Sequence, residues 1–306
     1  MPQQPTATAP DFSGFWVALV TPFRDGAVDH DALAALTRRL TADGVTGFVP
    51  CGSTGEAAAL DEAEQLAVLD TVLAAAGGLP VVMGISGYHL GKATAWARKL
   101  GERPIAGLLV AAPHYIRPSQ AGLLEWFGAI ADASTVPVLV YDIPYRTGVT
   151  IARDTLLALA AHPRIRGIKD CGGDMAKTRA VIADGRLQVL TGEDHQIFGT
   201  MAEGGVGAIA ASGNVQTRRF VELVRLLADN RLAEARAEWQ ALQPLVEMLF
   251  AEPNPGPLKA LLAHGGEVHD ELRSPMTRAS EGLRERLVAL DAHLDGPNRL
   301  DRLNRQ

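Results

Sequence analysis

The sequence contains few cysteines and no uninterrupted apolar segment, and each absence excludes a class of protein. Cys51 and Cys171 are the only cysteines, too few for a disulfide framework and without the paired spacing of a zinc site. They favour a reducing compartment, so we expect a cytoplasmic protein. Residues 71–91 carry no formal charge, but several glycines and Pro80 interrupt them, which argues against a membrane span.

Positive charge is also scarce. Lys and Arg total 29 against 35 Asp and Glu, a formal net charge of −6, and there is no long basic run, so nucleic acid is not an expected partner. Hydrophobic residues make up 47% of the chain and charged residues 21%, values typical of a folded globular protein. The first residues, MPQQPTATAP, lack the basic start and apolar stretch of a secretory signal, and we expect 1–13 to be a disordered leader.

Short apolar runs rich in Val, Ile and Leu recur along the 306 residues. They lie at 15–20, 46–50, 81–85, 106–111, 137–141, 165–169, 187–191 and 206–210. The runs do not alternate apolar with polar residues, a pattern typical of strands that are covered on both faces. The sequence therefore predicts eight strands in a parallel sheet.

Helical patterns with start and stop signals lie between these runs. Asp61 and Glu64 form a capping-box pattern, and Gly77 ends the helix that follows. Asp29 is the expected cap of an earlier helix, which ends at Gly44. Eight strand–helix units predict a (β/α)8 TIM barrel over 14–230. A doubly wound open sheet is the alternative, because the number of strands does not show whether a sheet closes.

After about residue 230 the strand pattern stops and apolar residues fall at helical spacing. We therefore expect 231–306 to form a C-terminal helical appendage to the barrel. Its segment EPNPGP, at 252–257, has three prolines in six residues and is expected to be a rigid connector outside any helix.

Polar residues that end the strands are the candidates for chemistry, because the active sites of barrels lie at that face. Lys169 ends an apolar strand, where desolvation would favour a neutral amine that can form a Schiff base with a ketone. Taken alone, a lysine in this position would more often form a salt bridge with Asp170 or extend to the solvent at the rim of the barrel than act as a nucleophile. Its neighbours reverse that expectation: Tyr141 ends the adjacent strand and could transfer protons.

Two further groups could bind carboxylates. Ser53 and Thr54 lie in a glycine-flanked turn and offer hydroxyls and backbone amides, although an ordinary turn would use the same glycines. Arg146 could hold a second carboxylate with its planar guanidinium, the alternative being a surface arginine.

Several motifs occur together and in order. They are VTPF at 20–23, GSTGE at 52–56, PHYIRPSQ at 113–120, YDIPYRTG at 141–148, GIKD at 167–170, TGED at 191–194 and EPNPGPLK at 252–259. With them, the chain from about 14 to 290 resembles the family of dihydrodipicolinate synthases and N-acetylneuraminate lyases. These are pyruvate-dependent class I aldolases on (β/α)8 barrels, and the resemblance implies no cofactor and no metal.

The resemblance implies roles for particular residues. Lys169 would form the Schiff base with pyruvate, Tyr141 would be the acid/base, and Thr54 would join its proton relay. Tyr115 would complete the relay from a neighbouring subunit, which implies a homodimer, commonly within a tetramer.

The same resemblance assigns the binding of small-molecule substrates, pyruvate and an aldehyde. Ser53 and Thr54 would bind the pyruvate carboxylate, and Arg146 would hold the carboxylate of the aldehyde. Gly192 and Ile209 would line the pyruvate pocket.

Arg146 favours the synthases, which condense pyruvate with aspartate semialdehyde to 4-hydroxy-tetrahydrodipicolinate in lysine and diaminopimelate biosynthesis. GSTGEA is closer to the lyases, so a catabolic 2-oxo acid aldolase or dehydratase stays open. A catalytically inactive barrel that acts as a binding protein is the alternative of another class. In synthases inhibited by lysine, an asparagine, a glutamate and a tyrosine bind the inhibitor. Tyr88, Lys92 and His114 occupy those positions here, so we expect insensitivity to lysine.

Overall fold

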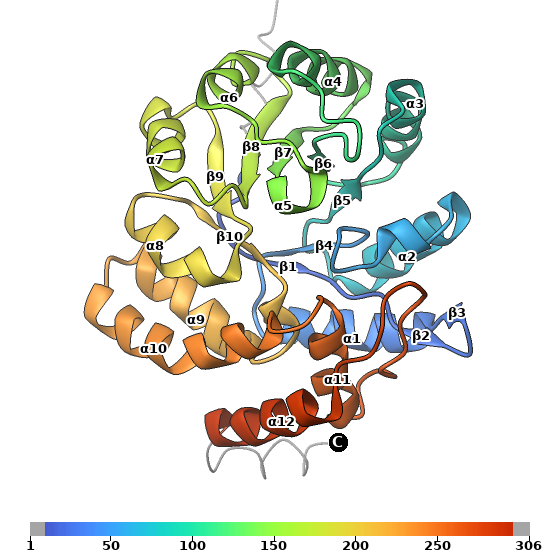
Figure 1. The fold of residues 1–306 in the computed structure, drawn as a ribbon, viewed down its shortest axis with the longest axis vertical. Helices are drawn as coiled ribbons and strands as arrows, with labels where there is room; N and C mark the ends of the chain where they lie inside the picture. The colour runs from blue at the N-terminus through green and yellow to red at the C-terminus, as the bar shows by residue number, and fades with distance from the viewer. Residues whose placement is uncertain (1–9, 296–306) are drawn as a thin grey trace, which may run out of the picture.

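A computed structural model describes residues 10–295, in which eight parallel strands form a closed barrel (Figure 1). The strands are β1 (Gly14–Ala18), β4 (Gly47–Val49), β5 (Val82–Ile85), β6 (Gly107–Ala111), β7 (Val138–Asp142), β8 (Ile165–Asp170), β9 (Gln188–Thr191) and β10 (Gly207–Ala210). Their order is β4-β1-β10-β9-β8-β7-β6-β5, and a parallel bridge between Phe48 and Val81 closes the ring. The predicted TIM barrel is therefore confirmed, and the open-sheet alternative is wrong.

Apolar side chains fill both sides of the barrel wall. Leu109, Leu139 and Ile209 belong to a core inside the barrel, whereas Leu108 and Val110 belong to the core between strands and helices. Because successive side chains of a strand point to opposite faces, both faces are apolar. This packing explains the continuous apolar runs of the sequence.

The barrel helices surround the sheet (Figure 1). They are α1 (His30–Ala42), α2 (Glu62–Ala75), α3 (Leu90–Leu100), α4 (Gln120–Ala133), α5 (Pro144–Thr147), α6 (Arg153–Leu159), α7 (Met175–Asp184), α8 (Ile197–Ala202) and α9 (Thr217–Ala228). The predicted capping box is present: Asp61 Oδ1 accepts from Glu64 N at 2.8 Å, and Glu64 Oε2 accepts from Asp61 N at 3.1 Å. Asp29 caps α1 through a hydrogen bond from Ala32 N at 3.0 Å.

A short hairpin that was not predicted follows β1. Its strands are β2 (Phe23–Arg24) and β3 (Ala27–Val28), which are antiparallel. Asp25 and Gly26 connect them with φ values of 53° and 81°, as a tight hairpin turn requires. An Asp-Gly pair is the usual sequence signal for such a turn.

Three helices form the C-terminal part, α10 (Leu232–Leu249), α11 (Gly256–His264) and α12 (Glu281–Asp295). The connector is shorter than expected, because Pro257 lies in the first turn of α11, where a proline has no helical hydrogen bond to lose. Helix α12 packs against α10 and α11.

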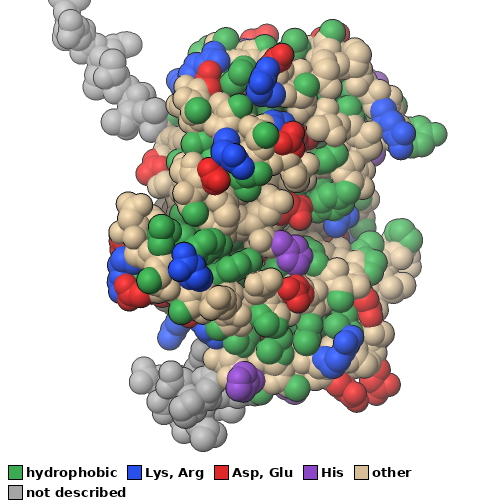
Figure 2. Space-filling view, turned by 60° about the vertical axis from the view of Figure 1, so that its left-hand side comes forward, with side chains coloured by type: hydrophobic (Ala, Val, Ile, Leu, Met, Phe, Trp, Pro, Cys, Tyr) green, Lys and Arg blue, Asp and Glu red, His purple; other side chains and the backbone are tan. Residues whose placement is uncertain are grey.

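The expected leader 1–13 falls partly outside the described residues, which begin at Pro10. Phe12, placed in that leader, is buried inside the barrel, and its N–H donates to Gln188 Oε1 at 2.7 Å. Within residues 10–295, no helix is long and apolar enough to span a membrane. On the face drawn in Figure 2, acidic and basic side chains are interspersed.

Candidate active site

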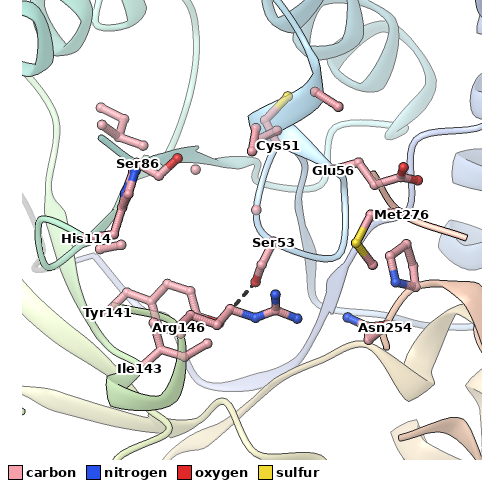
Figure 3. A pocket seen from close by; sticks show the side chains of 18 of the residues that line it. Cys51, Ser53, Glu56, Ser86, His114, Tyr141, Ile143, Arg146, Asn254 and Met276 are labelled. Atoms are coloured by element: carbon pink, nitrogen blue, oxygen red, sulfur yellow. Dashed lines mark hydrogen bonds between the residues drawn. The ribbon is translucent and has the colours of Figure 1, made fainter. Parts of the chain in front are cut away.

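A cavity of about 360 Å³ opens at the C-terminal ends of the strands (Figure 3). The loop after β4 contributes Ser53, β7 contributes Tyr141 and α5 contributes Arg146. Asn254 and residues 273–276 of the C-terminal part complete its wall. Barrel and appendage therefore build the cavity together.

Lys169 on β8 is held beside Tyr141 on β7. The two residues are paired in the register of these strands, and Lys169 Nζ lies 4.4 Å from the centroid of the Tyr141 ring. Lys169 is only 5% exposed, and burial lowers its pKa, more strongly than the nearby acidic groups raise it. The Asp170 carboxylate does not pair with Lys169. It instead accepts hydrogen bonds from Thr178 Oγ1 at 2.5 Å and from Gly172 N at 2.8 Å. Lys169 is thus suited to act as a neutral nucleophilic amine.

Tyr141 is suited to donate and accept a proton. Burial raises the pKa of its phenol well above the usual range, and the smaller influence of Ser53 lowers it. The phenol therefore stays protonated near neutral pH. Its Oη lies 3.4 Å from Ser53 Oγ. The hydroxyl in contact with the phenol is therefore that of Ser53, whereas the resemblance implied Thr54 for the relay.

The turn that carries Ser53 and Thr54 is anchored on several sides. Thr21 Oγ1 donates to Gly55 O at 2.7 Å, and Thr54 Oγ1 accepts from Asn254 Nδ2 at 2.9 Å. Glu56 has φ of 53° in the left-handed region, where its backbone is strained unless other contacts hold it.

Gly192 lies against the side chain of Lys169. A Cβ on Gly192 would fall 2.5 Å from both Lys169 Cε and Cys171 Sγ, so only glycine leaves room for the lysine side chain. Ile209 on β10 is 1% exposed and belongs to the core inside the barrel.

Arg146 lines the cavity, with its guanidinium 5.7 Å from the Tyr145 ring. No ion pair within residues 10–295 involves Arg146, so its charge has no acidic partner there. Nor does that part of the chain contain a group of three His, Cys, Asp or Glu residues arranged to hold a metal ion.

Comparison with known proteins agrees with this geometry. The model of the dihydrodipicolinate synthetase family matches residues 11–293. The chain is 40% identical over 282 residues to 4-hydroxy-tetrahydrodipicolinate synthase of Sorangium cellulosum, covering 90% of this chain and 94% of that protein. The protein belongs to the dihydrodipicolinate synthetase family.

Solved structures of dihydrodipicolinate synthases have the same fold. The enzyme from Aquifex aeolicus superposes with a TM-score of 0.91 at 31% identity, over 94% of this chain and 99% of that one. A chloride-inhibited synthase from Acinetobacter baumannii, solved with pyruvate, gives a TM-score of 0.90 at 30% identity, over 93% and 100% of the two chains.

Of the residues that the family resemblance implies for the site, Ser53, Tyr141 and Arg146 line the cavity, whereas Lys169, Thr54, Gly192, Ile209 and Tyr115 are not among its lining residues. Of the residues that do not line it, Tyr115 lies farthest from a buried position. Its side chain is 85% exposed, and its φ of 72° lies in the left-handed region. The neighbouring His114 does line the cavity, and its ring packs edge-on against Tyr88, with centroids 5.4 Å apart.

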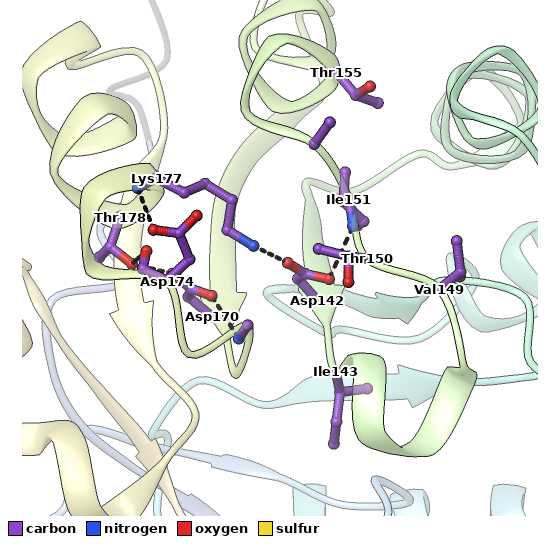
Figure 4. Close-up of polar contacts among 12 residues, drawn as sticks. Asp142, Ile143, Val149, Thr150, Ile151, Thr155, Asp170, Asp174, Lys177 and Thr178 are labelled. Carbon is purple, nitrogen blue, oxygen red and sulfur yellow. Dashed lines mark hydrogen bonds and ion pairs between the residues drawn. The ribbon is translucent and has the colours of Figure 1, made fainter.

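A buried ion pair connects α7 to the end of β7, the strand that carries Tyr141 (Figure 4). Lys177 on α7 pairs with Asp142, the residue after Tyr141, and both side chains are almost fully buried. Asp142 also accepts from Ile151 N at 3.2 Å. We did not predict this pair from the sequence, where the only signal was the position of an acidic residue directly after Tyr141.

Asn254 and Lys259 were also missed. Both lie in EPNPGPLK, which contributed to the family resemblance but in which we assigned no role to either residue. Asn254 contacts Thr54, and Lys259 Nζ, with its side chain fully buried, lies 2.5 Å from Glu56 Oε1. A lysine on an otherwise apolar helix was the signal that could have indicated a buried partner.

Proposed function

We propose that the protein is a lyase of the class I aldolase type that joins pyruvate to aspartate semialdehyde, giving 4-hydroxy-tetrahydrodipicolinate. The observation that carries the proposal is the pairing of Lys169 with Tyr141 on β8 and β7, beside a cavity that Tyr141 and Arg146 line. The names of the relatives at 35–40% identity support the same activity.

In the first half of the reaction, the neutral amine of Lys169 attacks the ketone carbon of pyruvate. Tyr141 gives a proton to the oxygen, water leaves from the carbinolamine, and a Schiff base forms. The Tyr141 phenolate then takes a proton from the methyl group, which yields the enamine and restores the phenol. Ser53 and Thr54 would bind the pyruvate carboxylate with hydroxyl and backbone N–H groups during these steps.

In the second half, the enamine carbon attacks the aldehyde carbon, and a proton from Tyr141 converts the new alkoxide to a hydroxyl. The amino group of the former semialdehyde then displaces Lys169 from the imine carbon, closing the ring and releasing the enzyme amine. Arg146 would hold the aldehyde's carboxylate through paired hydrogen bonds.

A catabolic 2-oxo acid aldolase would share Lys169 and Tyr141 but would have no need for a carboxylate-binding arginine at position 146. An inactive binding protein would need none of the three. Both alternatives are therefore less well supported than the synthase.

We infer that the active form is a homo-oligomer, a dimer or a tetramer, that operates in the cytoplasm. The exposed Tyr115 and its strained backbone support contact with a second subunit, which would cover the ring and hold this conformation.

Two buried free thiols, Cys51 and Cys171, support a reducing compartment.

The proposed function is tested by incubating the purified protein with pyruvate and a panel of aldehydes. Aspartate semialdehyde should give the highest kcat/KM, and aldehydes without a carboxylate should react poorly. Preference for a sugar aldehyde would overturn the proposal in favour of the catabolic alternative.

A further inference from the structure

Asn254 reaches the substrate-binding turn from the far end of the chain. Its Nδ2 donates to Thr54 Oγ1 at 2.9 Å, and the two residues are 200 positions apart in sequence. Thr54 is buried, and Asn254 is 9% exposed and lines the cavity. Figure 3 shows Asn254 on the opposite side of the cavity from Tyr141. The contact therefore joins the C-terminal part to the turn whose Ser53 contacts Tyr141.

The direction of this hydrogen bond determines what Thr54 can do. A threonine hydroxyl has one proton and two acceptor lone pairs, whereas the amide nitrogen of asparagine only donates. Because Asn254 Nδ2 supplies the proton of this bond, the hydroxyl proton of Thr54 remains available for another acceptor. A carboxylate of the substrate is such an acceptor, and a hydrogen bond to an ionised group is stronger than one between neutral groups.

A second contact keeps Asn254 and the turn in fixed relative positions. Glu56, two residues after Thr54, accepts from Lys259 Nζ at 2.5 Å and from Arg273 N at 3.1 Å. Lys259 belongs to α11, which begins two residues after Asn254 and is buried from Gly256 to Leu262. Since both side chains of the Glu56–Lys259 pair are buried, a break would leave an unpaired buried charge.

We propose that Asn254 is a positioning residue that holds the Thr54 hydroxyl as a hydrogen-bond donor to the carboxylate of the 2-oxo acid substrate. The proposal rests on the proposed function. It assigns the C-terminal part a role in substrate binding. The Glu56–Lys259 ion pair of α11 fixes the position of the Asn254 amide, and this amide orients the Thr54 hydroxyl.

Two substitutions of Asn254 separate this role from simple packing. Asn254→Asp keeps the shape but replaces the donor by an acceptor, so the Thr54 proton should turn toward Asp and away from the substrate. Asn254→Ala removes the contact and leaves the hydroxyl free to donate. We expect KM for pyruvate to rise about tenfold or more in Asn254→Asp, the effect of losing a hydrogen bond to a charged group, and clearly less in Asn254→Ala.

If Asn254 acted only by packing, KM for pyruvate would rise more in Asn254→Ala, which loses side-chain atoms, than in Asn254→Asp, which keeps the shape. An Asn254→Asp variant with the same KM as the wild type, or a lower KM than Asn254→Ala, would overturn the proposal. Thermal denaturation of both variants verifies that each is folded, and kcat measured at saturating pyruvate should change less than KM.

A double-mutant cycle shows whether Asn254 acts through Thr54. In a Thr54→Val background the hydroxyl is absent, so Asn254→Asp should raise KM no further than about twofold. An undiminished effect there would show direct repulsion between Asp and the substrate and would overturn the proposal. Capture of the pyruvate adduct by borohydride in the wild type tests the proposed function separately: no adduct would refute both, whereas an adduct with the wrong order of variants would refute only the role of Asn254.

Discussion

Lys169 Nζ lies 4.4 Å from the centre of the Tyr141 ring, and the two residues are paired in the register of β7 and β8. The amine and the phenol therefore depend on the same pair of hydrogen-bonded strands for their relative position. Behind those strands, Asp142 pairs with Lys177, and Asp170 accepts from Thr178. The reactive groups are thus held by two hydrogen-bonded strands of the barrel wall.

Tyr141→Phe should leave the fold intact and remove most of the activity. The ring still packs against Lys169, but the hydroxyl that contacts Ser53 is lost. We expect kcat to fall about 10²- to 10⁴-fold, the usual contribution of a general acid/base. Steady-state kinetics together with thermal denaturation measure this, and a variant with unchanged kcat would show that another group transfers the proton.

Formation of the pyruvate adduct should depend on pH through Lys169. Burial lowers its pKa, and only the neutral amine attacks, so the rate rises with pH and then becomes constant. The plateau should begin well below pH ~10.4, the pKa of an exposed lysine. Rates of capture by cyanoborohydride over a pH series would show it. A rate that still climbs near the pKa of an exposed lysine would mean that burial does not perturb the amine.

Tyr115 should act in the site of a neighbouring subunit. Tyr115→Phe and Lys169→Ala homo-oligomers should each be nearly inactive. A mixed dimer of the two contains one site with both residues intact, so activity should return to a fraction of the wild type. Re-associated Lys169→Ala subunits alone are the control. An absence of recovery in verified heterodimers would count against a shared site.

L-Lysine should not inhibit the protein. At the positions where lysine-inhibited relatives would bind the ligand, Lys92 brings a positive charge, and Tyr88 and His114 pack against each other. Like charges close together cost about 1 kcal/mol or more, and the attraction of a carboxylate is lost as well. Initial rates with millimolar L-lysine test this, and strong inhibition at submillimolar concentration would contradict it.

The barrel could be predicted because its signals are local. The capping box at Asp61 and Glu64 lies within four residues, and a buried strand such as β6 is a continuous apolar run. The β2–β3 hairpin was missed although Asp25-Gly26 signals such a turn, because its strands have only two residues each. Two-residue strands leave no periodic pattern to detect.

The support of the site could not be predicted in the same way. Glu56 and Lys259 are 203 positions apart, and Thr54 and Asn254 are 200 apart. Charge and hydrogen-bonding capacity are visible in the sequence, but the partners are set by the packing of α11 on the barrel. Lys169, Tyr141 and Arg146 were found because their strand ends must meet at one face of a closed barrel.

The most direct test of the account is to incubate the protein with pyruvate alone, reduce it with borohydride and map the adduct by mass spectrometry of the digest. The amine attacks the ketone before any aldehyde is needed, so one adduct per chain should form, on Lys169. An adduct on Lys92, Lys99, Lys177 or Lys259, or no adduct at all, would contradict the account.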